Sequence, residues 1–226
     1  MGSEPRRIRH QRWTAVHHRD VQDLLDAWAA LISRHSRDPA ANETGRALLA
    51  AWSEPHRSYH SVSHLRDVLA GVDELADLAD DADAVRLAAW YHDCVYNGLP
   101  DDEERSALRA ELDLSRLDVP AQLVDEVARL VRMTVSHDPA RGDHNAEVLS
   151  DADLAALALP TEDYRRNTEA IRAEYAHIPD EVFRKGRRLV LQALLGGQGV
   201  YRTEPGRQRW EAAAQRNLRA ELADLS

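Results

Sequence analysis

Histidine and aspartate side chains that could hold a metal ion occur in four short segments of the chain. The segments are 59–64, 90–93, 134–137 and 151–154, and they contain His60, His64, His92, Asp93, His137, Asp151 and Asp153. Neutral imidazole and carboxylate groups together suit Zn, Fe, Mn or Co among the divalent ions. Any one of these residues alone is more often a hydrogen-bonded core residue, but the ordered set favours a metal centre.

Apolar spacing indicates which of these side chains point inward. His64 is followed at four and eight residues by Val68 and Val72, so it shares their helix face. His92 follows two alanines on a second apolar face, and Asp93 is adjacent to it. A buried carboxylate is costly unless it is paired or bound to a metal. The small alanines of this face, Ala88 and Ala89, leave room beside Asp93 and offer it no partner, so a metal ion is the simplest one.

The last segment offers two aspartates. Asp153 has leucines four residues before and after it, at 149 and 157, which places it on the buried stripe. Asp151 has Glu147 and Ala155 at the same offsets, which is a more solvated setting. Periodicity therefore favours Asp153 as the ligand, with Asp151 as an alternative or as a residue that orients a ligand histidine.

Helical periodicity dominates the elements that must position these residues. Helices are expected over 21–32, 47–52, 62–75, 85–96, 120–134, 148–157, 161–175, 179–195 and 205–225. One more is expected to begin at a capping box formed by Asp101 and Glu104. The sequence contains no convincing alternating strand, and its loops are short. We expect an all-α fold, a single compact bundle of about nine or ten helices over 13–226 after a flexible 1–12. The polar loop 138–145 could border a pocket.

Composition narrows the classes of function. The 226 residues carry a formal net charge of -10, which argues against binding to nucleic acid polymers or anionic membranes. A small phosphorylated substrate remains possible, because a metal supplies positive charge locally. The single cysteine, Cys94, excludes a disulfide framework within the chain and fits a reducing compartment. The charged N-terminus lacks a secretory signal, and no apolar run is long enough to span a membrane, so we expect a cytoplasmic protein.

The order of the motifs resembles the signature of the HD superfamily of metal-dependent phosphohydrolases. That signature is a His, then His-Asp, then Asp, here His64, His92-Asp93 and Asp153. The stretch from Tyr59 to Val68 is also similar to cyclic-nucleotide phosphodiesterases. In those enzymes the first histidine of the pair, here His60, is the proton donor. The resemblance thus implies a metal site of His64, His92, Asp93 and Asp153.

A bacterial family of predicted HD phosphohydrolases is more similar still, over roughly residues 20–220. Its pattern appears here in the segments 54–60, 90–96, 102–107, 151–154 and 174–179. Two departures are evident. Ser61 replaces the usual Asn, and the additional histidine pair of binuclear members is missing, with only His137 and His144 in that interval. We therefore expect one divalent ion per chain, of Mn, Fe, Co, Ni, Zn or Mg.

The resemblance implies hydrolysis of a phosphoester or phosphoanhydride in a small, nucleotide-like substrate by metal-activated water. Asp93 would steer the water and His60 would act as general acid, although His60 could equally be a hydrogen-bonded structural residue. The expected substrate-lining residues are Arg57 as a phosphate clamp, His137, Glu104, Tyr175 and Arg187. Arg57 could instead be a surface residue, and His137 could simply stabilise a helix C-terminus.

Two other functions fit the same motifs. One is an HD-type di-iron oxygenase, which needs more histidine ligands than this chain offers. The other is a non-catalytic regulatory protein that binds nucleotide in the same pocket. The sequence leaves the oligomeric state open between monomer and homodimer.

Overall fold

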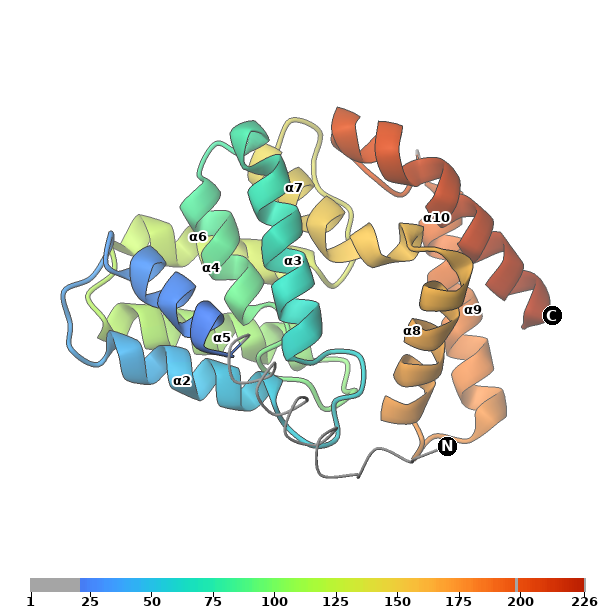
Figure 1. Cartoon of the computed structure of the whole chain (residues 1–226), viewed down its shortest axis with the longest axis horizontal. Helices are drawn as coiled ribbons and strands as arrows, with labels where there is room; N and C mark the ends of the chain where they lie inside the picture. Colours follow the sequence, from blue (N-terminus) through green and yellow to red (C-terminus); the bar gives the residue numbers. More distant parts are fainter. Residues whose placement is uncertain (1–20, 198, 226) are drawn as a thin grey trace, which may run out of the picture.

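Helices form all the regular secondary structure of the described residues, 21–197 and 199–225, in the computed structural model (Figure 1). A first helix covers 21–32 of the described range. It is followed by α2 (Ala41–Trp52), α3 (Val62–Leu75), the 3-10 turn η1 (Ala76–Leu78), α4 (Ala82–Tyr91), α5 (Asp102–Arg116), α6 (Ala121–Met133), α7 (His144–Leu154), the 3-10 turn η2 (Ala155–Ala158), α8 (Thr161–Glu174), α9 (Asp180–Gly196) and α10 (Glu204–Asp224). The expected all-α fold with about ten helices is confirmed. The predicted flexible segment 1–12 lies outside the described residues.

The main hydrophobic core joins the first helix to α2–α7. Trp28, Trp52 and Trp90 are fully buried in it. The indole N–H groups of Trp28 and Trp52 donate to the carbonyl oxygens of Ala41 and Trp90, at 2.8 and 3.0 Å, so burial leaves neither donor unpaired. The ring centroid of Trp52 lies 6.1 Å from that of His64 and 5.2 Å from that of His92, so this core contacts two of the candidate metal ligands.

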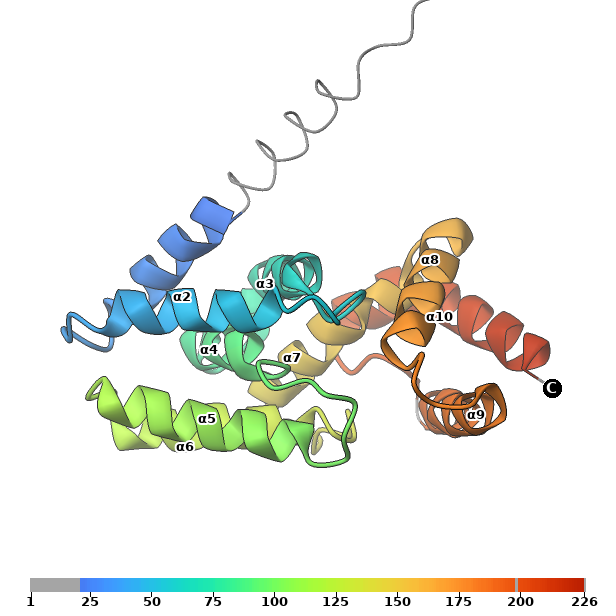
Figure 2. The same ribbon diagram turned by 90° about the horizontal axis from the view of Figure 1, so that it is seen from below.

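A second, smaller core lies between α8, α9 and α10. Tyr164, Leu191, Tyr201 and Leu218 are buried there, and Trp210 packs against both cores. Figures 1 and 2 show these three helices grouped on one side of the molecule, connected to the rest through α7 and η2. None of the helices in the described ranges is long and apolar enough to cross a membrane.

A buried carboxylate joins the two groups of helices. Asp151 on α7 accepts hydrogen bonds from the backbone N–H groups of Arg202 and Thr203, at 2.7 and 2.8 Å. It also accepts a hydrogen bond from the Thr203 hydroxyl, at 2.6 Å. That hydroxyl in turn caps α10 by accepting a hydrogen bond from the backbone N–H of Gly206. A Cβ at position 206 would lie only 2.4 Å from the carboxylate, so glycine permits this close approach. Asp151 therefore anchors the start of α10 to α7.

Two local predictions are wrong. The helix expected over 85–96 ends at Tyr91, with His92 as its C-terminal flanking residue. The expected capping box also fails, because the Asp101 side chain caps nothing. Instead the Asp102 carboxylate accepts hydrogen bonds from the backbone N–H groups of Asn97 and Leu99, at 2.7 and 2.9 Å. These bonds hold the chain after His92 in an irregular turn and compete with continuation of the helix.

A groove with a volume of about 1080 Å³ is bordered by the loop before α7 and the start of α10. Asp138, Pro139, Arg141 and Gly142 of this loop line it, which confirms the prediction that the loop borders a pocket. The loop ends at His144, where α7 begins. The groove includes none of His64, His92 and Asp153.

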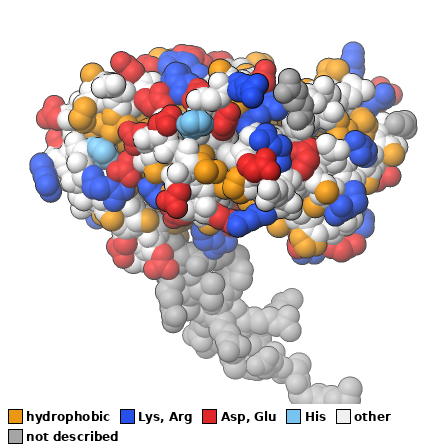
Figure 3. Space-filling model, turned by 90° about the horizontal axis from the view of Figure 1, so that it is seen from above, with side chains coloured by type: hydrophobic (Ala, Val, Ile, Leu, Met, Phe, Trp, Pro, Cys, Tyr) orange, Lys and Arg blue, Asp and Glu red, His pale blue; other side chains and the backbone are white. Residues whose placement is uncertain are grey.

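Figure 3 shows acidic and basic side chains interspersed over the molecular face seen from above Figure 1.

Candidate metal centre

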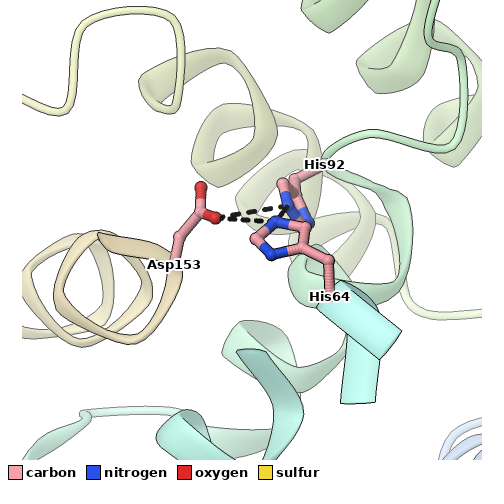
Figure 4. A group of neighbouring side chains, drawn as sticks. All are labelled: His64, His92 and Asp153. Atoms are coloured by element: carbon pink, nitrogen blue, oxygen red, sulfur yellow. Dashed lines mark hydrogen bonds and ion pairs between the residues drawn. The ribbon is translucent and has the colours of Figure 1, made fainter. Parts of the chain in front are cut away.

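Three side chains from three different segments meet at one point inside the helical bundle (Figure 4). His64 lies in the first turn of α3, His92 follows the last residue of α4, and Asp153 lies near the end of α7. The three helices pack against one another. A Cβ at Gly71 on α3 would lie 3.1 Å from the Cα of Ala152 on α7, so the missing side chain lets these helices approach closely. This close approach brings His64 to Asp153.

The separations among the donor atoms are those of ligands around a common ion. His64 Nε2 and His92 Nε2 are 3.4 Å apart, and Asp153 Oδ1 lies 3.0 and 3.6 Å from them. All three donor atoms lie within 4.8 Å of one another. Two nitrogens bonded at about 2.0–2.1 Å to one tetrahedral ion are expected roughly 3.3–3.4 Å apart. The residues present therefore fit a divalent metal ion.

The orientation of His92 also suits a ligand. Its Nδ1 lies 2.9 Å from the carbonyl oxygen of Ala89, which can only accept, so Nδ1 carries the hydrogen. Carbonyls in the last turn of a helix lack an intrahelical partner, and the end of α4 thus provides this acceptor. In the neutral ring Nε2 then presents its lone pair toward His64 and Asp153. Such a bond to the second nitrogen is typical of metal-bound histidines.

Asp93 stands beside this three-residue group. Its Oδ2 lies 3.3 Å from His92 Nε2 and 4.0 Å from the Nε2 atoms of both His64 and His60. It is therefore placed between the candidate metal ligands and His60. Both aspartates are slightly exposed, at 15% for Asp93 and 11% for Asp153, whereas the His92 side chain is 1% exposed. The histidines thus form the floor of the site, and the carboxylates line its opening.

Mutual charge interactions perturb the protonation of these groups. Burial opposes a charge on His92, yet the carboxylates of Asp93 and Asp153 outweigh it and raise the pKa of His92 to about 9. Burial also disfavours charge on Asp153, but His92 and His64 hold the pKa of that carboxyl far below its usual range. His92 likewise lowers the pKa of Asp93 against the effect of burial. Without a metal ion, a proton on His92 thus provides the positive charge that balances the carboxylates.

His60 is held by a residue distant in sequence, Glu174 at the end of α8. Its Oε2 lies 2.7 Å from His60 Nδ1, and its Oε1 accepts the backbone N–H groups of Ser58, Tyr59 and His60 at 2.7–2.9 Å. Although burial acts in the opposite direction, these contacts lower the pKa of Glu174. The ionised Glu174 carboxylate accepts a hydrogen bond from the Nδ1–H group of His60. The other ring nitrogen of His60, Nε2, therefore faces Asp93. The sequence patterns quoted above include Glu174, but give it no role.

Arg57 is buried and directs its guanidinium at the backbone. It donates to the carbonyl oxygens of His60, Asp93 and Cys94, at 3.2, 2.7 and 3.3 Å, and to the Glu54 carboxylate at 3.1 Å. The side chain has no exposed surface. These contacts hold together the two loops that carry His60 and Asp93. They leave the guanidinium no open face for a phosphate, so Arg57 does not fit the expected role of a phosphate clamp.

His137 and Tyr175 border the site. His137 lies in the turn after α6 with a positive φ of 48°, and its Nε2 is 3.4 Å from Asp153 Oδ2. Burial lowers the pKa of His137, which favours the neutral ring. Tyr96 stacks on His60 with ring centroids 4.1 Å apart, and the hydroxyl groups of Tyr96 and Tyr175 are 3.4 Å apart. Tyr175 therefore contacts the site through Tyr96.

Other candidates lie farther away or have different partners. Glu104 pairs with Arg132 on the surface and not with the site. Its neighbour Glu103 is half-buried, and burial together with Asp93 raises the pKa of that carboxyl. Arg187 forms two bonds to Glu221, at 2.7 and 3.0 Å. Asp151 anchors α10 with both of its oxygens, which leaves Asp153 as the member of the pair that faces the histidines.

Comparisons with family models, curated proteins and solved structures found no match.

Proposed function

We propose that the chain is a metal-dependent phosphohydrolase of the HD type, acting on a phosphoester or phosphoanhydride of a small, nucleotide-like substrate. The observation that carries this proposal is the convergence of His64 Nε2, His92 Nε2 and Asp153 Oδ1 at separations of 3.0–3.6 Å. His64, His92 and Asp153 would hold one divalent ion, with Asp93 as the adjacent fourth ligand. Such an ion supplies a Lewis acid and a bound water of lowered pKa.

The residues around the ion would divide the remaining chemistry between them. Asp93, placed between the histidine pair and His60, would orient the attacking water. His60 would donate a proton from Nε2 to the leaving oxygen, because Glu174 holds Nδ1 and fixes the direction of the ring. General acid catalysis of this kind contributes about 10²- to 10⁴-fold in rate. The His60 side chain is 19% exposed, so a substrate oxygen can reach it.

The direct test is a screen of nucleotides and phosphoesters with protein loaded separately with Mn, Co, Ni, Zn or Mg. We expect phosphate release that depends on the added metal and that falls strongly in His60→Asn, while metal content stays unchanged. His56→Asn is a matched control, because His56 contacts the Tyr96 carbonyl outside the metal group. Equal activity of the His60 and His56 variants would contradict the role given to His60.

The same samples, together with protein loaded with iron, separate the two rival functions. A di-iron oxygenase would contain two irons per chain and show a visible absorption band. A regulatory protein would bind nucleotide without releasing phosphate. We favour the hydrolase because three donors converge on one position and Glu174 holds His60 beside them, where it would act as the proton donor.

A further inference from the structure

His137 has a backbone conformation that is more usual for glycine. It lies in the turn after α6 with a φ of 48°, and its backbone N–H donates to the carbonyl oxygen of Met133, at 3.1 Å. Many helices end in this way, with glycine or asparagine at the residue of positive φ. Larger residues are strained there. They persist where surrounding contacts hold them, and such strained residues cluster at functional sites.

The contacts that hold the His137 ring come from two residues of α7. Its Nδ1 is 3.2 Å from Ser150 Oγ, and its Nε2 is 3.4 Å from Asp153 Oδ2. Ser150 is fully buried, and the His137 side chain is 17% exposed. Residues three positions apart lie on the same side of a helix, so one ring can contact both. His137 therefore joins the turn after α6 to the side of α7 that carries the candidate metal ligand.

His137 faces the oxygen of Asp153 that is turned away from the ligand histidines. Oδ1 of Asp153 lies 3.0 Å from His64 Nε2 and 3.6 Å from His92 Nε2, and Figure 4 shows the other oxygen pointing away from both rings. An ionised carboxylate can only accept, so a favourable contact with Oδ2 needs a hydrogen on His137 Nε2. In the neutral ring Nδ1 then accepts from the Ser150 hydroxyl. At 3.4 Å the contact with Asp153 is longer than an ideal hydrogen bond, so we expect it to orient the carboxylate rather than to bind it tightly.

We propose that His137 is a positioning residue, which engages Oδ2 of Asp153 so that this aspartate presents only Oδ1 to the metal ion. The proposal rests on the metal site of the proposed function and adds a residue that acts on the ion through Asp153. Groups that orient a metal ligand in this way typically contribute about 10- to 100-fold in metal affinity. Ser150 has no exposed surface, so it is not a nucleophile and serves to orient the His137 ring.

Two amide side chains at position 137 separate this role from a purely structural one. The amide nitrogen of glutamine extends about as far as Nε2 of histidine, and that of asparagine about as far as Nδ1. We expect His137→Gln to bind metal within about threefold of wild type, and His137→Asn to bind it at least about 10-fold more weakly. Asparagine tolerates a positive φ better than glutamine. In chemical denaturation, metal-free His137→Asn should therefore be at least as stable as metal-free His137→Gln.

The dissociation constant of the metal ion, measured by titration against a competing chelator, decides between the two roles. A role confined to the turn would make metal affinity follow stability, so that His137→Asn binds as tightly as His137→Gln or more tightly. That result would overturn the proposal and leave the metal site standing. A wild-type protein that binds no ion would overturn the metal site and this proposal together.

Ser150→Ala provides a second test in the same titration. It removes the hydroxyl that donates to His137 Nδ1, so metal affinity should fall severalfold when His137 is present. In His137→Gly the ring is gone and glycine fits the positive φ, so Ser150→Ala should have no further effect on metal affinity. An equal loss of affinity from Ser150→Ala in both backgrounds would contradict an action of Ser150 through His137 and would overturn the proposal.

Discussion

At the scale of single residues, the site places His60, the proposed proton donor, beside the candidate metal ligands. His92 is oriented by the carbonyl of Ala89, and His60 by the carboxylate of Glu174, so each ring presents Nε2 to the site. Asp93 lies beside both of these nitrogens. Because Glu174 holds His60, a substitution of His60 should leave the neighbouring metal group in place.

Glu174→Gln should lower turnover by about 10-fold or more while leaving metal content unchanged. The amide is a weaker acceptor for His60 Nδ1–H and for the three backbone N–H groups, so the ring loses its fixed direction. The measurement is kcat with metal content determined on the same sample. Glu104→Gln is the control, because Glu104 pairs with Arg132 at the surface. A Glu174→Gln enzyme with wild-type kcat would contradict this role.

Metal uptake at pH 7 should release protons. The pKa of His92 is raised to about 9 in the metal-free protein, so the ring carries a proton at pH 7 that it must lose to act as a ligand. Because that proton is bound below pH 9 and absent above it, the release should decline as pH rises through 9. Calorimetric titration in buffers of different ionisation enthalpy measures this release. A release that grows above pH 9 would contradict the charge balance described here.

The same shifts give the pH dependence of stability in the metal-free protein. A raised pKa on His92 contributes stability that is fully present below the unfolded value of about 6.5 and is lost as pH rises through 9. The lowered pKa of Asp153 contributes stability that is present above about 4 and is lost as pH falls. We therefore expect greatest stability between about pH 4 and 6.5, measured by denaturant titration. His92→Gln should remove the loss near pH 9.

At the scale of elements, α7 carries both the metal-site aspartate and the anchor for α10. Asp153 faces the histidines, whereas Asp151 accepts three hydrogen bonds from Arg202 and Thr203. Two residues apart on a helix, the aspartates point in different directions, so one helix orients the site and attaches the C-terminal helices.

Asp151→Ala should lower the free energy of unfolding by about 3 kcal/mol, because it leaves buried donors of Arg202 and Thr203 unpaired. Chemical denaturation provides the measurement. Asp77→Ala, at an exposed position in η1, should change stability by less than about 0.5 kcal/mol. Similar losses in the two variants would show that Asp151 does not anchor α10.

Sequence periodicity predicted the helices well, and it selected Asp153 over Asp151, because local apolar spacing defines a buried face. It failed after Tyr91, where the Asp102 carboxylate holds the turn through Asn97 and Leu99. It also missed the role of Glu174, which is 114 residues from His60. Long-range pairs leave no periodic signal, and only the folded chain brings them together.

At the scale of the whole molecule, both groups of helices contribute residues to the site. The first core places His64, His92 and Asp153, and the C-terminal helices contribute Glu174. Asp151 and Glu174 both bridge the two groups of helices, one at each end of the η2–α8 segment. A change in the position of α8 would therefore act on His60 before it acted on the metal ligands.

The central claim is that His64, His92 and Asp153 form a metal site. Its most direct test is the metal content of purified protein after loading and removal of free ion, measured by mass spectrometry. We expect about one divalent ion per wild-type chain and almost none in His92→Ala. His144→Ala should match wild type, because His144 contacts Asp80 at the surface. Equal metal content in wild type and His92→Ala, or no metal in wild type, would contradict the account.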